Sequence, residues 1–368
     1  MNDPPALRQF IRVPHYVYRD DPQWIAPLDF QEKHRFSPKR PFFEHARWQA
    51  WVALRDGRPL GRISAQVDDL HQQCYGDQTG FFGMIEAVDD AEVFTLLFDT
   101  AQAWLAEQGM RRARGPFNLT INEELGVLVD GFEQPPSILM GHGRPWYDAR
   151  IKAVGYRGIK DLLAFMINPD FAAPAVMRKL ARRASRDVTV RSMRRRRLVE
   201  DTGIMREIFN DAWRDNWGFV PFTESEFTDL VKSLALLLPE DYVQIAEYRG
   251  NPAAFIVMLP NLNEAIRGLR GRLFPVGLIK LLWRLKVRGL RSGRVPLMGV
   301  RREFQHSPLG PVMAFMVIDA VRQCAVRRGM VATEMGWVLE DNQAMRNIIE
   351  TIGGEAYKRY RIYEKEFG

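Results

Sequence analysis

The chain has 368 residues, of which 46% are hydrophobic and 26% are charged, and its formal net charge is +7. This composition is typical of a globular protein with one large domain or two ordinary ones. The two cysteines have no metal-ligand spacing, which excludes a disulfide framework and fits a reducing cytosol. The N-terminal stretch MNDPPALRQF lacks the basic and apolar parts of a signal peptide, so we expect a cytoplasmic protein.

In chain order, the first strong signals are a β-hairpin over residues 54–67, a helix that ends at Gly109, a strand, and a short helix closed by Gly155 before another strand. Glycine is the usual residue just after a helix, so these glycines mark element ends. The second half repeats the order, with a hairpin over 246–259, a helix ending at Gly329, a strand, a helix closed by Gly353 and a last strand. The repeat predicts a duplicated domain, with chance similarity among ordinary segments as the alternative.

We therefore expect an α/β fold of two tandem domains, each a mixed twisted sheet flanked by helices. The first should cover residues 1–167, a basic linker and first strand 168–199, and the second domain 200–368, with an insertion at 263–292. Two helices are predicted within 200–237, the second capped by Thr223 with Glu226 three residues later.

In the second copy, a strand ending at Val300 runs into the polar loop REFQHSPLG and then into a helix that begins near Gly310. Free amides at a helix N-terminus bind pyrophosphate groups. Pro308 has no N–H, which removes one donor from such a loop. The remaining amides expected to bind phosphate belong to Gln305, His306, Ser307, Leu309 and Gly310.

This strand, loop and helix resemble the acyl-CoA-binding motif of the GNAT acyltransferases, although Arg302 and Pro308 depart from the family pattern. Asn342 adds to the resemblance, because it follows a strand and precedes Gly353 by eleven residues. The resemblance implies a GNAT fold, with acyl-CoA as co-substrate and no permanently bound cofactor. It also implies that Val300, the loop amides and Asn342 contact the acyl-CoA, while a plain helix N-cap is the alternative for Asn342.

The family often has a tyrosine seven residues after this asparagine that protonates the departing thiolate, but Ile349 stands there. Tyr360, on the last strand, is a substitute by proximity only. For a general base, Glu334 and Glu340 share one face of a predicted strand, and His306 borders the cofactor loop, as does Glu303. The catalytic candidates are therefore Glu340, Glu334, His306 and Tyr360, each of which could instead be a solvated or capping side chain.

The first copy lacks a comparable loop. Asp89 and Asp90 stand where its long helix begins, and these acids would repel a pyrophosphate, so we expect a degenerate domain without its own acyl-CoA. A long loop containing Asn118, Asn122, Glu123 and Glu124 is expected to reach an acceptor. The histidines are scattered without metal-ligand spacing, so we expect no metal site.

The insertion mixes apolar residues with cations between residues 267 and 294. Leu278, Leu281, Leu282 and Leu285 fall on one helical face, and Lys280, Arg284 and Arg288 lie to the other side. A basic amphipathic helix is typical of an element that binds an anionic membrane surface. The alternatives are a helix packed on its own domain and, with the arginine run 194–197, a nucleic-acid partner, which we do not favour.

The whole chain resembles a group of bacterial tandem-GNAT proteins, on segments such as DPQWIAPL, GFFGMIEA, NDAWRDNWGFVP and GWVLEDN. Bacterial ceramide synthases are GNAT-type enzymes that acylate the amine of a sphingoid base. The resemblance implies an acyl-CoA-dependent N-acyltransferase with a lipid acceptor such as a sphingoid base, peripheral on the inner membrane. The alternatives are an N-acetyltransferase acting on a small soluble amine and a nucleic-acid-binding or non-catalytic protein of GNAT descent.

Overall fold

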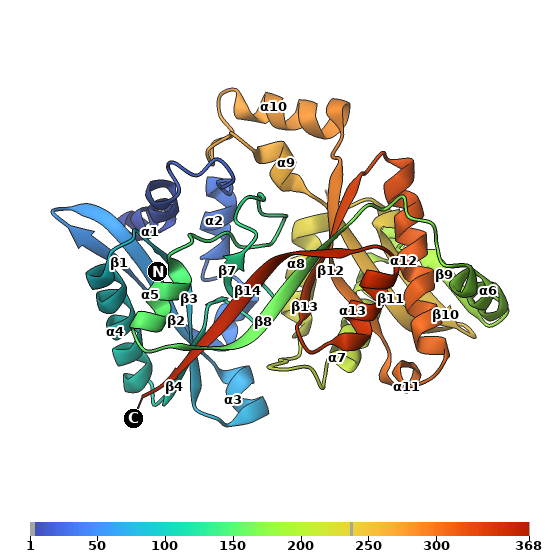
Figure 1. The fold of residues 1–368 in the computed structure, drawn as a ribbon, viewed down its shortest axis with the longest axis horizontal. Helices are drawn as coiled ribbons and strands as arrows, with labels where there is room; N and C mark the ends of the chain where they lie inside the picture. The colour runs from blue at the N-terminus through green and yellow to red at the C-terminus, as the bar shows by residue number, and fades with distance from the viewer. Residues whose placement is uncertain (1–3, 236–237, 368) are drawn as a thin grey trace. The chain divides into compact units, whose positions relative to one another are not determined.

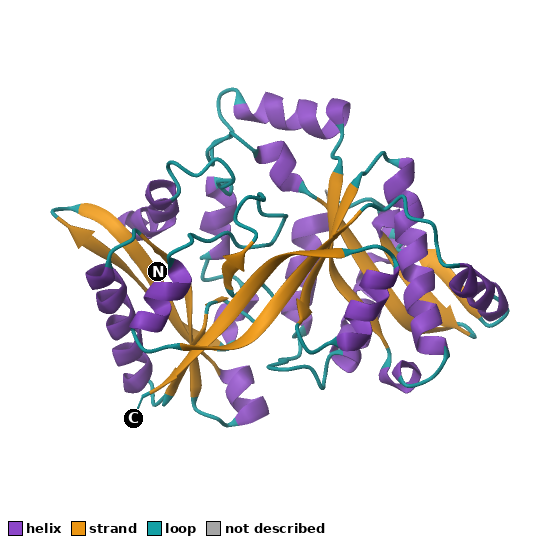
Figure 2. Ribbon diagram, in the orientation of Figure 1, coloured by secondary structure: helices purple, strands orange, loops and turns teal. Residues whose placement is uncertain are grey.

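The computed structural model describes residues 4–235 and 238–367 (Figure 1). The chain divides into two compact units. Unit 1 comprises Met1–Leu163, Ala265–Leu282 and Tyr357–Gly368, and unit 2 comprises Ala164–Glu264 and Trp283–Ala356. In both units strands form a sheet and helices pack against it (Figure 2), as the predicted α/β fold requires.

Unit 1 begins with helices that precede its sheet. Its elements are α1 (Pro4–Val17), α2 (Asp29–Arg35), η1 (Pro41–Glu44), β1 (Ala46–Arg55), β2 (Arg58–Asp68), α3 (Asp69–Tyr75), β3 (Thr79–Ala87), α4 (Ala91–Glu107), β4 (Arg112–Gly115), β5 (Phe117–Asn118), β6 (Glu124–Leu125), β7 (Val127–Asp130), α5 (Tyr147–Ala153) and the first part of β8 (Arg157–Ile167).

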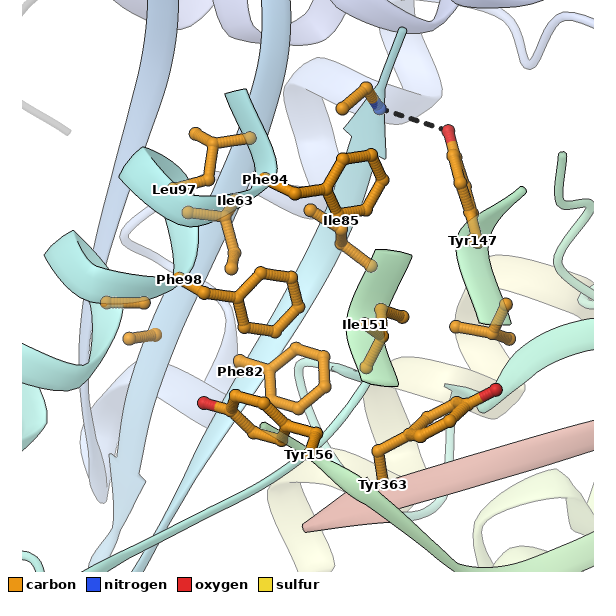
Figure 3. Packing of buried hydrophobic residues seen from close by; sticks show 14 of the residues in the cluster. Ile63, Phe82, Ile85, Phe94, Leu97, Phe98, Tyr147, Ile151, Tyr156 and Tyr363 are labelled. Carbon is orange, nitrogen blue, oxygen red and sulfur yellow. Dashed lines mark hydrogen bonds between the residues drawn. The ribbon is translucent and has the colours of Figure 1, made fainter. Parts of the chain in front are cut away.

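The core of unit 1 forms where α4 packs on the sheet. Ile63, Ala65 and Val67 alternate along β2 and belong to one buried cluster with Phe94 and Phe98 of α4. Figure 3 shows Ile63, Phe94 and Phe98 in this cluster. Successive strand residues point to opposite faces, so the intervening residues of β2 face away from α4. Helix α1 packs on the same strand. Both faces of β2 are therefore covered.

Unit 2 carries the second copy of the predicted pattern. Its elements are α6 (Ala175–Ala184), β9 (Val188–Ser192), η2 (Arg195–Arg197), α7 (Leu198–Ala212), α8 (Glu224–Ala235), η3 (Glu240–Tyr242), β10 (Val243–Tyr248), β11 (Asn251–Pro260), β12 (Ser292–Val300), α11 (Arg302–Gln305), α12 (Leu309–Arg327), β13 (Ala332–Leu339) and α13 (Gln343–Thr351).

Helices α7 and α12 cover opposite faces of the unit 2 sheet. A Cβ on Gly299 of β12 would contact Phe255 of β11 and Ile208 of α7. Ile256, the residue after Phe255 on β11, points to the other face and lines an apolar pocket with Ile318 of α12. By length and composition α12 could cross a membrane, but 56% of its apolar window is buried inside the protein. It packs on β10, β11 and β12, which is the position of a core helix.

The predicted duplication is confirmed by the order of strand pairings. In unit 1, β1–β2 and β2–β3 are antiparallel and β3–β4 is parallel. In unit 2, β10–β11 and β11–β12 are antiparallel and β12–β13 is parallel. Gly57 and Gly250 lie at the two hairpin turns with positive φ, as predicted. The predicted capping box is also present, because Thr223 Oγ1 accepts from the amide of Glu226 and the Glu226 carboxylate accepts from the amide of Thr223.

The compact units divide the chain differently from the predicted domains. The last strand, β14 (Glu355–Glu366), pairs antiparallel with β4 and β7, so the end of the chain completes the sheet of unit 1. The division also falls within β8, whose residues 164–167 belong to unit 2. Residues 265–282 of the insertion belong to unit 1 as well.

The insertion consists of α9 (Leu262–Ile266), α10 (Gly277–Trp283) and a π-helical turn, η4 (Arg284–Arg288). The prediction that Leu278, Leu281, Leu282 and Leu285 form the exposed apolar side of this helix is wrong. Leu281 packs against a buried cluster that joins Ile25 and Leu28 to Ile266 and Leu269. Leu278 and Leu285 are half-buried, and only Leu282 of the predicted face is exposed. The residues that point to solvent are instead Val276, Ile279, Leu282 and Trp283.

Candidate active site

Strands β12 and β13 part within unit 2. Their parallel pairing runs from Ser292 opposite Ala332 to Val295 opposite Met335 and then ends, although both strands continue. The two strands therefore separate beyond Val295 and Met335. Backbone groups on the facing edges beyond Val295 need other partners, because an unpaired buried polar group costs free energy.

Two side chains bond to the edge of β12 beyond that point. The Trp213 indole donates to the carbonyl oxygen of Met298 at 2.9 Å, and its ring meets that of Trp337 on β13 edge-on, with 5.8 Å between centroids. Gln305 Nε2 donates to the carbonyl oxygens of Val300 at 2.8 Å and Ala212 at 3.1 Å. Trp213 was not predicted as a site residue. The only sequence signal was that it lies in NDAWRDNWGFVP, one of the segments that carry the family resemblance.

The predicted phosphate-binding loop lies between β12 and α12 and contains the short helix α11, which was not predicted. The Ser307 amide donates to the Phe304 carbonyl at 2.9 Å. The Leu309 amide donates to Ser307 Oγ at 3.2 Å, and the Gly310 amide to the Ser307 carbonyl at 3.2 Å. These three predicted phosphate donors therefore make bonds inside the loop. His306 is exposed at the end of α11.

Ser307 acts as the N-cap of α12. Pro308 already has helical φ and ψ angles and occupies the first helical position, where a missing N–H costs nothing. Ser307 Oγ accepts from the second helical residue, as capping serines do. Gly310 is buried, and a Cβ there would come within 2.4 Å of the Phe304 carbonyl oxygen. The helix start is therefore held tightly against α11.

Asn342 is the N-cap of α13, because its side-chain oxygen accepts from the Met345 amide at 3.1 Å. The alternative interpretation of this residue is thus confirmed, and a contact with acyl-CoA stays a prediction. Glu340, two residues earlier, is exposed, and its backbone carbonyl accepts from Arg346 at 2.9 Å.

Glu334 lies directly opposite Arg294, one residue pair before the strands part. The carboxylate lies 3.0 Å from the Arg294 guanidinium, and both side chains are at most 5% exposed. Arg294 also donates to the Gly336 carbonyl at 2.9 Å, which ties β12 to the residue where β13 leaves its partner. To act as a base, Glu334 would have to give up this ion pair.

Tyr360 lies in unit 1 on β14. Its side chain is fully buried, and its hydroxyl donates to the Gly141 carbonyl at 3.2 Å. The other predicted site residues lie in unit 2. The structure therefore brings together the loop from Val300 to Gly310 within one unit and gives Tyr360 a buried hydrogen bond in the other.

The two copies differ at the strand position that carries Val300. Gly61 and Ala254 each lie four residues after the hairpin glycine and are paired with Ala87 and Val300. In unit 1 the Ala87 amide donates to the hydroxyl of Tyr147 at 3.0 Å (Figure 3). The Ala87 amide, which corresponds to the Val300 amide of unit 2, is thus bonded to the Tyr147 side chain.

The long helix of unit 1 also begins differently. Asp90 caps α4 through bonds from the Glu92 and Val93 amides, so an acid stands where unit 2 has Ser307. The predicted acceptor loop is engaged in ion pairs, with Glu124 2.7 Å from Arg35 and Glu123 3.1 Å from Arg40. Among the described residues, no group of three or more His, Cys, Asp or Glu is arranged to hold a metal ion.

Solved structures share the fold of this chain. A tandem GNAT protein from the clavulanic acid biosynthesis pathway superposes with a TM-score of 0.57 at 14% identity, over 100% of this chain and 96% of that one. The glucosamine N-acetyltransferase region of a fungal β-N-acetylglucosaminidase gives a TM-score of 0.60 at 16% identity, over 99% of this chain and 37% of that one. These likenesses concern the fold.

Sequence comparison gives nearer relatives. Protein YghO of Escherichia coli K12 is 51% identical over 98% of this chain and 93% of its own length. The bacterial ceramide synthase of Caulobacter vibrioides is 44% identical over 98% of this chain and 95% of its own. The chain belongs to the family of these two relatives and is an N-acyltransferase of the GNAT fold. No family model matches the chain.

This N-acyltransferase should be sensitive to loss of the buried cation at the parting strands. Arg294→Met places an apolar side chain beside the Glu334 carboxylate, and we expect the free energy of unfolding to fall by about 3 kcal/mol, measured by urea denaturation. The matched control Arg294→Met with Glu334→Leu removes both charges and should recover most of this loss. Equal stabilities of the single and double variants would show that the ion pair does not hold the strands.

Proposed function

We propose that this N-acyltransferase takes a long-chain acyl group from an acyl-CoA and transfers it to the amine of a membrane lipid such as a sphingoid base. The single observation that carries the lipid acceptor is the apolar surface of the segment from Phe274 to Val287. Phe274 is 76% exposed, Ile279 69% and Trp283 54%. Exposed apolar side chains gathered in one segment are typical of a surface that binds a membrane or a partner.

Cations in the same segment support a membrane over a protein partner. Lys280, Lys286 and Arg288 are exposed, and among the described residues none of them forms an ion pair. Each cation near an anionic leaflet contributes about 1 kcal/mol to binding. The base of the segment is anchored in unit 1, where Leu269 packs in the buried cluster and the Gly271 carbonyl accepts from the Asp29 amide at 2.9 Å. Because residues 269–271 are held in unit 1, the rest of the segment keeps its apolar side chains exposed to solvent.

The name of the Caulobacter relative, a bacterial ceramide synthase, supports the sphingoid base as the acceptor. An apolar pocket in unit 2 supports an alkyl group at this site. It lies between the sheet and α12. Its lining includes Ile256, Val295, Ile318, Met335 and Ile352. Such a lining favours alkyl groups over polar ones.

The acyl-CoA would bind where β12 and β13 part, with its pyrophosphate at the start of α12. Phosphate oxygens would replace Ser307 as acceptors for the Leu309 and Gly310 amides, and the helix dipole would favour the negative charge. Ser307 Oγ, released from its capping bond, could donate to the phosphate itself. The Val300 amide would stabilise the oxyanion that forms when the thioester carbonyl is attacked.

The amine attacks only in its neutral form, so a nearby group must accept a proton. We propose Glu340 first, because it is exposed next to β13 and close in sequence to Asn342. Glu334 is second, since its pairing with Arg294 would have to be broken, and His306 is third. The base takes one proton from the attacking nitrogen, and the other N–H stays in the amide. The thiolate of CoA, a good leaving group, departs as the C–S bond breaks and takes up a proton from water. Tyr360 is buried and bonded to Gly141 in unit 1, so it takes no part in this step.

Acyl-CoA binding is tested by thermal melting, because a ligand that binds only the folded protein raises its melting temperature. Asn342→Ala should weaken palmitoyl-CoA binding about fivefold through loss of one hydrogen bond. It also removes the cap of α13 and lowers the melting temperature without ligand. Asn342→Ser keeps the cap but shortens the side chain, so it should lose the ligand effect alone. Wild-type shifts in both variants would mean that Asn342 does not contact acyl-CoA.

Membrane binding is tested by vesicle sedimentation. Replacing Lys280, Lys286 and Arg288 with Glu should abolish binding to phosphatidylglycerol vesicles, because three attractive charges become repulsive, while palmitoyl-CoA binding stays unchanged. The matched control makes the same charge change on α6, at the exposed Lys179, Arg182 and Arg183. Retained vesicle binding in the first variant, or acylation by the wild type of short soluble amines only, would contradict the lipid acceptor.

A further inference from the structure

Strand β2 of unit 1 has a buried polar face. Arg62, Ser64 and Gln66 alternate with the apolar residues that meet α4, and they are only 5%, 0% and 0% exposed. Gln66 donates to the carbonyls of Phe117 and Leu119, both at 2.8 Å. A polar strand face normally lies in water. Its burial under α1 and the loop after β4 creates a polar interior in unit 1.

Glu86 of β3 lies in this interior, directly opposite Arg62 in the strand register. The Arg62 guanidinium contacts Phe10 instead of Glu86. It donates to the Phe10 carbonyl at 3.1 Å and lies 4.7 Å above the Phe10 ring. Within the described part of the chain, no ion pair joins Glu86 to Arg62 or to any other cation. Its carboxylate accepts instead from the Tyr147 hydroxyl at 2.7 Å.

A second hydroxyl faces the same carboxylate. Tyr18, which directly follows α1, is 1% exposed and stacks on Trp24, with 5.2 Å between ring centroids. Its hydroxyl interacts with Glu86, yet it closes no hydrogen bond of normal geometry with any described residue. A buried hydroxyl without such a bond is uncommon, because it forfeits its bonds to water. A ligand at Glu86 would supply the missing partner.

The neighbouring carboxylates are already matched by cations. Burial by itself would raise the pKa of Glu124, but the Arg35 guanidinium outweighs this effect and lowers it. Glu123 lies 3.1 Å from Arg40, although burial still raises the pKa of its carboxylate. Glu86 is therefore the carboxylate in this interior that lacks a direct counter-ion, and it keeps a small exposed fraction through which a ligand could reach it.

We propose that Glu86, Tyr18 and Tyr147 form a binding site for the ammonium group of a primary amine. An ammonium group has three donors and a positive charge. The Glu86 carboxylate and the Tyr18 oxygen would accept from it, and its charge would supply the missing counter-ion. The site belongs to unit 1 alone, the unit that lacks the phosphate-binding loop, and it goes beyond the proposed function.

Protonation of Glu86 would control this site. Burial raises the pKa of Glu86 to about 7, against the opposing effects of Arg62 on β2, Tyr18 just after α1 and Tyr147 on α5. Glu124 on β6 repels it and adds to the rise. Only the ionised carboxylate attracts an ammonium group, so affinity should increase as the pH rises through 7, while an alkylammonium stays charged.

Isothermal titration of the full-length protein with octylammonium chloride tests the site. In the wild type we expect the dissociation constant to fall about tenfold between about pH 6 and about pH 8, with proton release on binding. Glu86→Gln should weaken binding at least tenfold and remove the pH dependence. Glu107→Gln, which neutralises an exposed carboxylate of α4 in the same unit, should behave as the wild type. Octanol, without the charge, should not bind at the site.

Tyr18→Phe removes a single oxygen and keeps the proposal testable if Glu86→Gln fails to fold; it should weaken octylammonium binding severalfold. The proposal is overturned if either variant binds octylammonium as tightly as the wild type, or if wild-type binding does not change with pH. Acyl-transfer assays separate the two proposals. Octylammonium binding without transfer to any lipid amine would reject the proposed function and leave this site standing.

Discussion

The end of pairing between β12 and β13 is the constraint on which unit 2 depends. Parallel strands normally satisfy each other's backbone groups along their whole length. Here pairing stops after Val295 and Met335, and the buried pair of Arg294 and Glu334 holds the strands together up to that point. Beyond it, Trp213 and Gln305 take over carbonyls that a neighbouring strand would have satisfied. An opening in a sheet is thus stable because specific side chains replace the lost ladder.

Unit 1 meets the same constraint with a different set of side chains. Its parallel pairing ends after Phe81 and Arg114. The strand edge beyond is covered by its own chain, since a Cβ on Gly83 would collide with the Phe117 carbonyl at 2.0 Å and Tyr147 bonds to the Ala87 amide. Little room remains there for a pantetheine arm. Duplication followed by this closure leaves a sheet of the same topology whose polar interior is available for another task.

Much of the fold could be predicted because glycines mark the ends of its helices. Gly109, Gly155, Gly329 and Gly353 all have positive φ at the ends of the predicted helices, and the strands follow them closely. The capping box at Thr223 was readable for a similar reason, since it depends on two residues three positions apart. Local signals of this kind survive in sequence because the neighbours that matter are near in the chain.

Features that depend on distant contacts could not be predicted. Nothing in YKRYRIY indicates that β14 pairs with β4 rather than staying with its own copy. The short helix α11 and the bonds inside the phosphate-binding loop depend on packing of Gly310 against Phe304. The lipid-facing side of α10 was misjudged because Leu281 finds a buried partner cluster far away in sequence.

The polar interior of unit 1 shows the same limit most clearly. The alternation of RISAQV predicts a strand with one face in water, and only the packing of α1 reveals that both faces are buried. Glu86 gave a faint signal as a single acid in the apolar stretch GFFGMIEA, but its meaning depends on the register that sets it opposite Arg62. A charge in an apolar strand gains significance once its counter-ion is found to point elsewhere. That is why the unit first interpreted as degenerate holds the carboxylate most in need of a cationic ligand.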